Sequence, residues 1–200
     1  MPTFTDVNPL TVELNSKNCD YLFNSLTSQE VPPGRNVGNQ GQRDSFLRVY
    51  RLYLNLHGQY HNGSVEVERF EVSQENYRIA VIQAFHAQPY HNLPNLDAVL
   101  FTGYTSKEAQ KMIQEEKNPT REHVYPRNRT LRLDLFDPPN PLSFREFICH
   151  YVSKGGIFTY TSSTENRRLR KYHDENPDAL ETMHWREIYA QCNIEQHTDG

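Results

Sequence analysis

The sequence lacks a long hydrophobic run and is poor in cysteine. Of its 200 residues, 36% are hydrophobic, and no apolar stretch approaches the roughly 20 residues that a membrane-spanning helix needs. The first residues show no basic segment followed by an apolar one, so we expect no secretion signal. Cys19, Cys149 and Cys192 lie far apart and form no C-x-x-C pair, which argues against a disulfide framework or a zinc ribbon. These absences predict a cytoplasmic protein with no membrane partner.

The chain carries little net charge, and its basic residues are unevenly distributed. The formal net charge of −4 argues against a general polyanion binder, which usually has a basic balance overall. Two segments are nevertheless basic, namely 117–132, where Glu122 is the single acid, and 167–171, which has none. A local basic surface on a mildly acidic protein can still contact a phosphate backbone. The residues predicted to make such contacts are Arg121, Arg127, Arg129, Arg167, Arg168, Arg170 and Lys171.

Helix starts are marked by side chains that can cap a helix N-terminus. Two of them are capping boxes, Thr105 with Glu108 and Ser143 with Glu146, in which each side chain satisfies a free backbone N–H. The predicted helices begin at Ser73, at Thr105, at Ser143, at Ser163 or Thr164, and at Pro177. The helix that begins at Ser143 is expected to stop at Gly155.

A turn signal at residues 62–63 predicts a β-hairpin, because Asn-Gly suits the positive φ angles of a type I′ turn. Apolar residues alternate on both sides of this turn, at Leu52, Leu54 and Leu56 and then at Val65 and Val67. The run 46–54 fits a helix equally well, so both alternatives stay open.

Short strands and loops complete the pattern. Strands are predicted at 10–15, 98–101 and 156–161, and the composition of 31–41 is typical of a loop. The chain shows no internal repeat and no regular βαβ rhythm. We therefore expect an α+β fold, as one domain with a modest appendage.

The segment 120–127, Thr-Arg-Glu-His-Val-Tyr-Pro-Arg, is short, extended and flanked by arginines. Further along the chain, the strand at 157–161 runs directly into the basic helix that carries Asn166. If the two strands fold back as a hairpin, the helix lies across them and Glu122 and His123 come near Asn166. In an ideal strand Glu122 and His123 point to opposite faces, so a bulge or a strand end is needed for both to serve one site.

These groups suit phosphodiester hydrolysis. A carboxylate oxygen from Glu122 and an amide oxygen from Asn166 are a ligand set for Mg²⁺, an ion that keeps several waters. The imidazole of His123 can take a proton from water near neutral pH. A divalent ion, a base and surrounding arginines together indicate a phosphodiester hydrolase.

The same residues resemble the HNH, or ββα-metal, nuclease family. In that family an acidic residue and a His close the first strand, commonly as D-H-x-x-P or E-H-x-x-P, and here the motif is Glu122-His123-Val-Tyr-Pro126. An Asn near the start of the following helix supplies the second metal ligand, and segment 161–167, with Asn166, looks like that element. The resemblance covers about 117–175. It implies that His123 is the general base and that Glu122 and Asn166 bind one Mg²⁺ or Mn²⁺ ion.

The chain departs from the family pattern in two respects. The gap between His123 and Asn166 is long and must hold an inserted helix at 143–154. Many members of the family also carry a second His on the helix as a metal ligand. His173, two turns after Asn166, could take that role, so the choice between Asn166 and His173 stays open.

The resemblance implies a metal-dependent DNA endonuclease of the restriction, phage or mobile-element type. We expect its core, an HNH-like ββα-metal unit, at 105–176, an accessory or recognition region at 1–104, and a C-terminal helix and tail at 177–200. DNA is the expected partner, and the N-terminal region could also form a homodimer. The alternatives are a non-catalytic nucleic-acid-binding module and a protein-interaction domain, the latter favoured by the acidic net charge.

Overall fold

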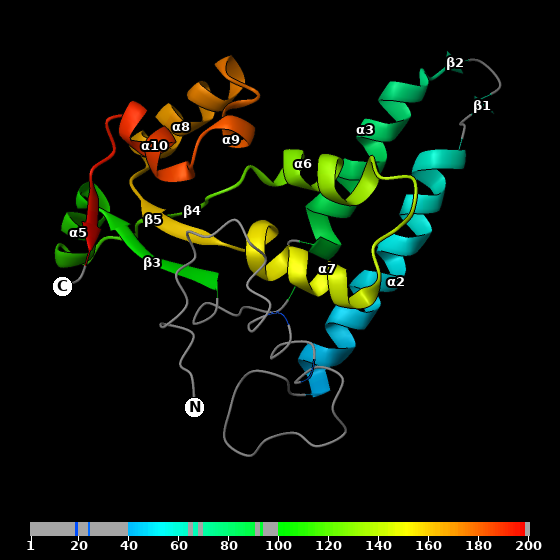
Figure 1. Ribbon diagram of the computed structural model, residues 1–200, viewed down its shortest axis with the longest axis horizontal. Coiled ribbons are helices and arrows are strands. Elements are labelled where there is room, and N and C mark those ends of the chain that lie inside the picture. Colours follow the sequence, from blue (N-terminus) through cyan, green and yellow to red (C-terminus); the bar gives the residue numbers. More distant parts are fainter. Residues whose placement is uncertain are drawn as a thin grey trace.

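The computed structural model describes residues 19, 24, 40–63, 66–67, 70–90, 93 and 100–198. Its fold is α+β, as the sequence predicts, with helices on both sides of a small mixed sheet (Figure 1). The strand predicted at 10–15 and residues 31–39 of the predicted loop lie outside the described residues. Within the described part of the chain, no helix has the length and apolarity that crossing a bilayer requires.

The sheet has the strand order β4-β5-β3-β6. Its strands are β3 (Phe101–Ser106), β4 (Thr120–His123), β5 (Phe158–Thr161) and β6 (Gln196–Thr198). The central strand β5 is parallel to β3 and antiparallel to β4, and β6 is antiparallel to β3. Strand β4 therefore stands at one edge of the sheet, where one row of its backbone N–H and C=O groups is not paired with another described strand.

The predicted hairpin around residues 62–63 is wrong, and a long helix, α2 (Gln40–Asn62), takes its place. The helix forms because Phe46, Val49, Tyr53 and Tyr60, all nearly inaccessible to solvent, recur at helical spacing and bury one aromatic face. The alternating Leu52 and Leu54 are instead partly exposed. Two very short strands follow, β1 (Glu66–Val67) and β2 (Phe70–Glu71), which pair with each other.

The helical part of the chain consists of α-helices and π-helical turns. The remaining elements are α3 (Gln74–Phe85), η2 (His86–Tyr90), α5 (Lys107–Gln114), α6 (Arg127–Thr130), η3 (Leu131–Phe136), α7 (Phe144–His150), η4 (Tyr151–Gly155), α8 (Ser163–Glu175), α9 (Ala179–Thr182) and α10 (Trp185–Gln191). The insertion between the two strands of the predicted site thus contains four helical elements, α6 to η4, rather than one helix.

The predicted helix starts are largely confirmed. Ser73 caps α3, and Ser143 with Glu146 forms the expected capping box at α7. The box predicted at Thr105 is wrong by one residue, because β3 continues through Ser106 and this serine caps α5 instead. The strand predicted at 98–101 is found at 101–106 (residues 98 and 99 are not described), and the helix predicted from Pro177 is two helices, α9 and α10.

Two hydrophobic cores lie on either side of the β4–β5 pair. The first is aromatic and joins α2 and α3 to η3, α7 and Phe158 of β5; in it Tyr53 stacks on Phe147 with ring centroids 5.4 Å apart. The second joins Val124, just after β4, to Leu169 of α8 and to Trp185 and other residues of α10. Because residues 46–93 and 131–158 share the first core, the N-terminal region is packed directly against the insertion.

Candidate functional site

Strand β5 brings strand β4 and helix α8 together, because it pairs with β4 and comes directly before α8 in the chain. Glu122 lies opposite Thr159 and His123 opposite Phe158 in the antiparallel register, so the predicted pairing of the two strands is confirmed. Helix α8 then begins after Ser162, whose side chain forms a capping box with Glu165. This box fixes the first turn of α8 and with it the position of Asn166.

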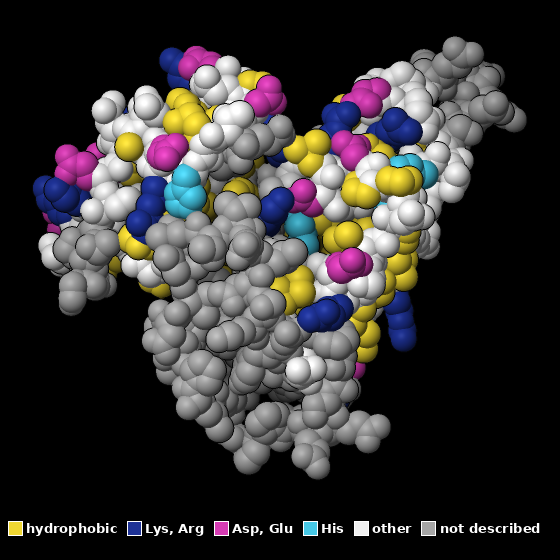
Figure 2. All heavy atoms as spheres, in the orientation of Figure 1, with side chains coloured by type: hydrophobic (Ala, Val, Ile, Leu, Met, Phe, Trp, Pro, Cys, Tyr) yellow, Lys and Arg dark blue, Asp and Glu magenta, His cyan; other side chains and the backbone are white. Residues whose placement is uncertain are grey.

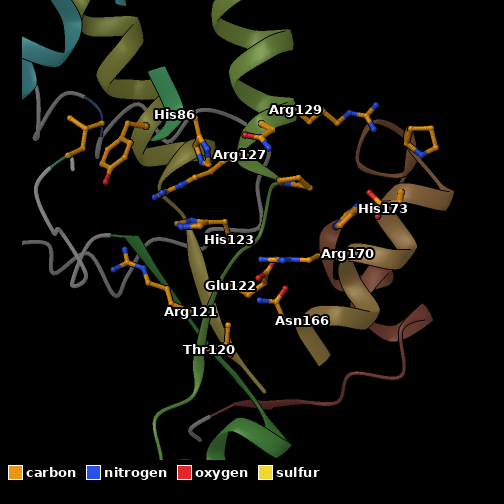
Figure 3. Close-up of a pocket in the computed structure, with 16 residues that line it drawn as sticks. His86, Thr120, Arg121, Glu122, His123, Arg127, Arg129, Asn166, Arg170 and His173 are labelled. Carbon is orange, nitrogen blue, oxygen red and sulfur yellow. The ribbon is translucent and has the colours of Figure 1, made fainter. Parts of the chain in front are cut away.

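The cleft beside β4 has a volume of about 1190 Å³ and brings most of the predicted site residues together (Figure 3). The predicted residues that line it are Arg121, Glu122, His123, Arg127, Arg129, Asn166, Arg170 and His173. Arg167, Arg168 and Lys171 are not among its lining residues. Arg168 lies 3.7 Å from a carboxylate oxygen of Glu108 on α5. Lys171 lies 3.7 Å from a carboxylate oxygen of Glu175, an i,i+4 pair of the kind that is usual on a solvated helix face.

Glu122 and Asn166 form the polar centre of one side of the cleft, with Arg170 beside them (Figure 3). Burial raises the pKa of the Glu122 carboxyl to about 7, although the charge of Arg170 acts in the opposite direction. Asn166 is 8% exposed, and its Oδ1 atom has no hydrogen-bond partner among the described residues. A buried acceptor without a donor costs stability, so a ligand in the cleft is the expected partner of this oxygen.

The donor set fits Mg²⁺ or Mn²⁺ better than zinc. In the part of the chain that the structure describes, no three His, Cys, Asp or Glu side chains are close enough together to hold a metal ion, whereas protein zinc sites usually use three or four such ligands. One carboxylate and one amide oxygen, the latter without an internal partner, match an ion that keeps several of its waters. The fit therefore rests on Glu122 and Asn166.

His173 lines the cleft two turns beyond Asn166 on α8. Burial and, to a smaller degree, the charge of Arg129 lower the pKa of its imidazole. Arg129 in turn lies 3.1 Å from Asp178, so this pair joins α6 to the segment after α8 at the cleft. The role of His173 as a ligand stays a prediction.

His123 is the last residue of β4 and lines the same cleft from the opposite side of the strand from Glu122 (Figure 3). The strand therefore ends at His123, which meets the condition that Glu122 and His123 can serve one site only at a bulge or a strand end. The Nδ1 atom of His123 lies 3.3 Å from the carbonyl oxygen of Ile157. When Nδ1 carries the proton and donates it to this carbonyl, Nε2 is the nitrogen that can act as a base.

Arginines form much of the cationic wall of the cleft. The guanidinium of Arg121 stacks on the ring of Phe158, with its central carbon 3.7 Å from the centre of the ring. Arg127 Nε donates a hydrogen bond of 3.1 Å to the carbonyl oxygen of Gly155. Stacking and a fixed hydrogen bond hold these two side chains in defined orientations. The acids that line the cleft are Glu122 and Asp174, so its local charge is positive.

Some lining residues were not identified from the sequence. His86 belongs to η2, and Tyr151 to η4, so the N-terminal region and the insertion both contribute to the cleft. No local motif marks His86 as functional, because its position depends on how α3 packs in the first core.

No protein-family model, curated protein or solved structure matches this chain.

Proposed function

We propose that this protein is a divalent-metal-dependent DNA endonuclease with an HNH-type, ββα-metal site. The observation that carries the proposal is the pair Glu122 and Asn166, with an unpartnered amide oxygen, in a cleft walled by arginines. The order antiparallel β4–β5 and then α8 supports it, because it is the order in which the family carries its motif.

In the proposed site, Glu122 and Asn166 would hold one Mg²⁺ or Mn²⁺ ion, which would supply positive charge for the leaving 3′ oxygen. His123 removes a proton from the attacking water. Arg170, beside Glu122, binds a non-bridging oxygen of the phosphate. The products of this reaction carry 5′-phosphate and 3′-hydroxyl ends.

The placement of His123 and Glu122 on opposite sides of β4 supports in-line hydrolysis. In an in-line displacement, the attacking water and the leaving oxygen lie on opposite sides of the phosphorus. A phosphate at the end of β4 would meet the base on one side and the metal ligands on the other. Because β4 ends at His123, side chains from both faces of the strand can border a phosphate placed at this end.

The distribution of charge also supports a polyanionic substrate. On the face shown in Figure 2, basic and acidic side chains are interspersed over the described elements, so this face as a whole has no dominant charge. The lining of the cleft differs, because it contains four arginines and two acids. A local positive potential in a cleft concentrates anionic substrates even when the net charge of the protein is −4.

Cleavage of supercoiled plasmid DNA tests the proposal. We expect nicking or linearisation by the wild type with Mg²⁺ or Mn²⁺, no cleavage with EDTA, and a loss of at least about 100-fold in His123→Ala. His184→Asn is a matched control, since His184 caps α10 outside the cleft and Asn is also a good capping residue.

The outcomes separate the proposed function from its alternatives. Metal-dependent cleavage that persists in His123→Ala would contradict the role of His123. DNA binding in EDTA without cleavage in any metal, on DNA of varied sequence, would instead indicate a non-catalytic binding module. Absence of DNA binding at low salt would favour a protein-interaction domain.

A further inference from the structure

One face of the sheet carries aromatic side chains from two strands, next to the cleft. In the antiparallel register Tyr160 lies opposite Arg121 and Phe158 opposite His123, and Phe101 of β3 is the parallel partner of Phe158. Paired residues point to the same face of a sheet, and so do residues two apart on one strand. These five side chains therefore share one face, which is opposite to the face of the proposed metal ligands.

The three aromatic rings contact one another. The ring centroid of Phe158 lies 5.6 Å from that of Phe101 and 5.4 Å from that of Tyr160, and the last two are 5.4 Å apart. The guanidinium of Arg121 lies over the Phe158 ring, and Figure 3 shows Arg121 on the side of β4 that faces away from Asn166. Phe101, Phe158 and Tyr160 thus form a compact aromatic platform with a positive charge on it.

The aromatic platform is not completely covered. Phe158 is 0% exposed, whereas Phe101 and Tyr160 are half-buried, although both pack against the first core. Tyrosine suits a position where one part of the ring is apolar and the other reaches polar surroundings. The accessible parts of Phe101 and Tyr160 are the surface that a further planar group can contact.

The aromatic platform is continuous with the cleft. Arg121 and His123 share the face of the platform and also line the cleft. The two residues are two positions apart on β4, which is about 7 Å along an extended strand. A polyanion whose cleaved phosphate lies at His123 can therefore place its next nucleotide over the platform.

We infer that the aromatic platform stacks an unpaired base of the DNA, next to the phosphate that is cleaved. Every base has a π-face, so stacking on an aromatic ring tolerates any sequence. In an intact duplex these faces are covered by the neighbouring bases, so the platform selects single-stranded DNA or a nucleotide turned out of the helix. The inference rests on the proposed nuclease function for the identity of the ligand as DNA, and it adds the class of substrate.

The test is the stacking of a fluorescent base, measured in EDTA so that no cleavage occurs. Short single strands with 2-aminopurine at each position in turn are titrated with the wild type, Tyr160→Phe and Tyr160→Leu, because 2-aminopurine loses fluorescence when it stacks on a ring. We expect saturable quenching in the wild type and in Tyr160→Phe. Tyr160→Leu, which keeps an apolar contact with the first core but has no π-face, should bind about 10-fold more weakly, with little quenching.

Two controls separate stacking from a structural effect of the substitution. Tyr172→Leu changes a half-buried tyrosine of α8 outside the cleft and should behave as the wild type does. In a second strand an abasic residue replaces the quenched base, so the backbone is kept and the ring is absent. The wild type should bind this strand about 10-fold more weakly, and Tyr160→Leu should bind both strands equally.

Three results would overturn the aromatic platform. The first is the absence of quenching at every position in the wild type, a measurement that does not depend on a variant that folds. The second is an equal loss of affinity for both strands in Tyr160→Leu, because the lost contact would then not be with the base. The third is a preference of the wild type for an intact duplex over the single strand of the same sequence.

The two proposals fail in different ways. Quenching that depends on Tyr160, without cleavage in any metal, leaves the platform standing and removes the nuclease. Metal-dependent cleavage that depends on His123, without quenching, retains the nuclease and removes the platform.

Discussion

The Ser106 hydroxyl donates a hydrogen bond of 2.5 Å to the buried carboxylate of Glu165. Glu165 precedes Asn166 and also accepts from the backbone N–H of Ser162, at 2.7 Å. The end of β3 is thereby tied to the first turn of α8. This contact sets where Asn166 stands relative to Glu122, and it connects residues that are far apart in the sequence.

Replacing Ser106 by alanine should destabilise the protein by about 1–3 kcal/mol. The change removes both the cap of α5 and one hydrogen bond of a buried carboxylate. Urea denaturation measures the effect. Ser163→Ala is the control, because Ser163 is exposed at the start of α8 and its replacement should change stability by less than about 0.5 kcal/mol. Equal stability of the two variants would contradict the structural role of the Ser106–Glu165 contact.

Glu122→Gln should abolish stabilisation by Mg²⁺. A ligand that binds only the folded state raises the melting temperature, and the proposed ion needs the Glu122 carboxylate. We expect a higher Tm with MgCl₂ than with EDTA for the wild type, and no difference for Glu122→Gln. Glu175→Gln, an exposed acid on the same helix as Asn166, should respond as the wild type does. An equal Mg²⁺ response in Glu122→Gln would remove Glu122 from the ligand set.

The contribution of His150 to stability should fall as the pH drops below about 6.5, whereas Glu122, whose pKa burial raises to about 7, contributes in the opposite direction over the same range. Burial lowers the pKa of this imidazole below its ordinary value, although Asp134 acts in the opposite direction. The unfolded state therefore binds a proton at a higher pH than the folded state, so this contribution to stability is present above about 6.5 and is lost as the pH falls through the folded pKa. Urea midpoints between about pH 5 and 8 measure the loss. In His150→Gln this part of the pH dependence should disappear; if it persists, other groups cause it.

Two glycine-to-alanine changes should have opposite effects on the stability of the folded protein. In Gly155→Ala the new Cβ meets Tyr90, at 1.7 Å from the hydroxyl and 2.9 Å from the adjoining ring carbon, so we expect a loss of about 1–3 kcal/mol. Gly58, within α2, has no atom within 4 Å of an added Cβ, and Gly58→Ala should stabilise the helix by about 0.5–1 kcal/mol. Thermal denaturation of both variants provides the comparison. A stabilising Gly155→Ala would mean that Tyr90 does not lie where the structure places it.

Arg170→Ala should lower kcat/KM for DNA cleavage by about 100-fold, because it removes a positively charged donor beside the proposed metal ligands. Arg167→Ala, also exposed on α8 but outside the cleft, should change it by less than about threefold. Steady-state cleavage of a defined duplex gives both values. Similar losses in the two variants would show that α8 acts through its general charge rather than through Arg170.

The sequence by itself determined the features that depend on neighbouring residues. Capping side chains indicate the starts of α3, α7 and α8, and the strand-like segment 156–161 indicates β5. The residues Glu122, His123 and Asn166 were predicted in the same way, from local motifs and their order along the chain. Helix starts are encoded by local sequence, and this is why those predictions agree with the structure; the structure places Glu122, His123 and Asn166 along one cleft, and their roles stay predictions.

Tertiary packing alone decided the rest. Alternating leucines and an Asn-Gly pair favoured a hairpin, yet burial of Phe46, Tyr53 and Tyr60 against the first core made the segment a helix. The same packing carries His86 and Tyr90 to the cleft from a distant part of the chain. No pattern within a segment records which other segment will cover it, because the free energy of burial arises only when the two surfaces meet.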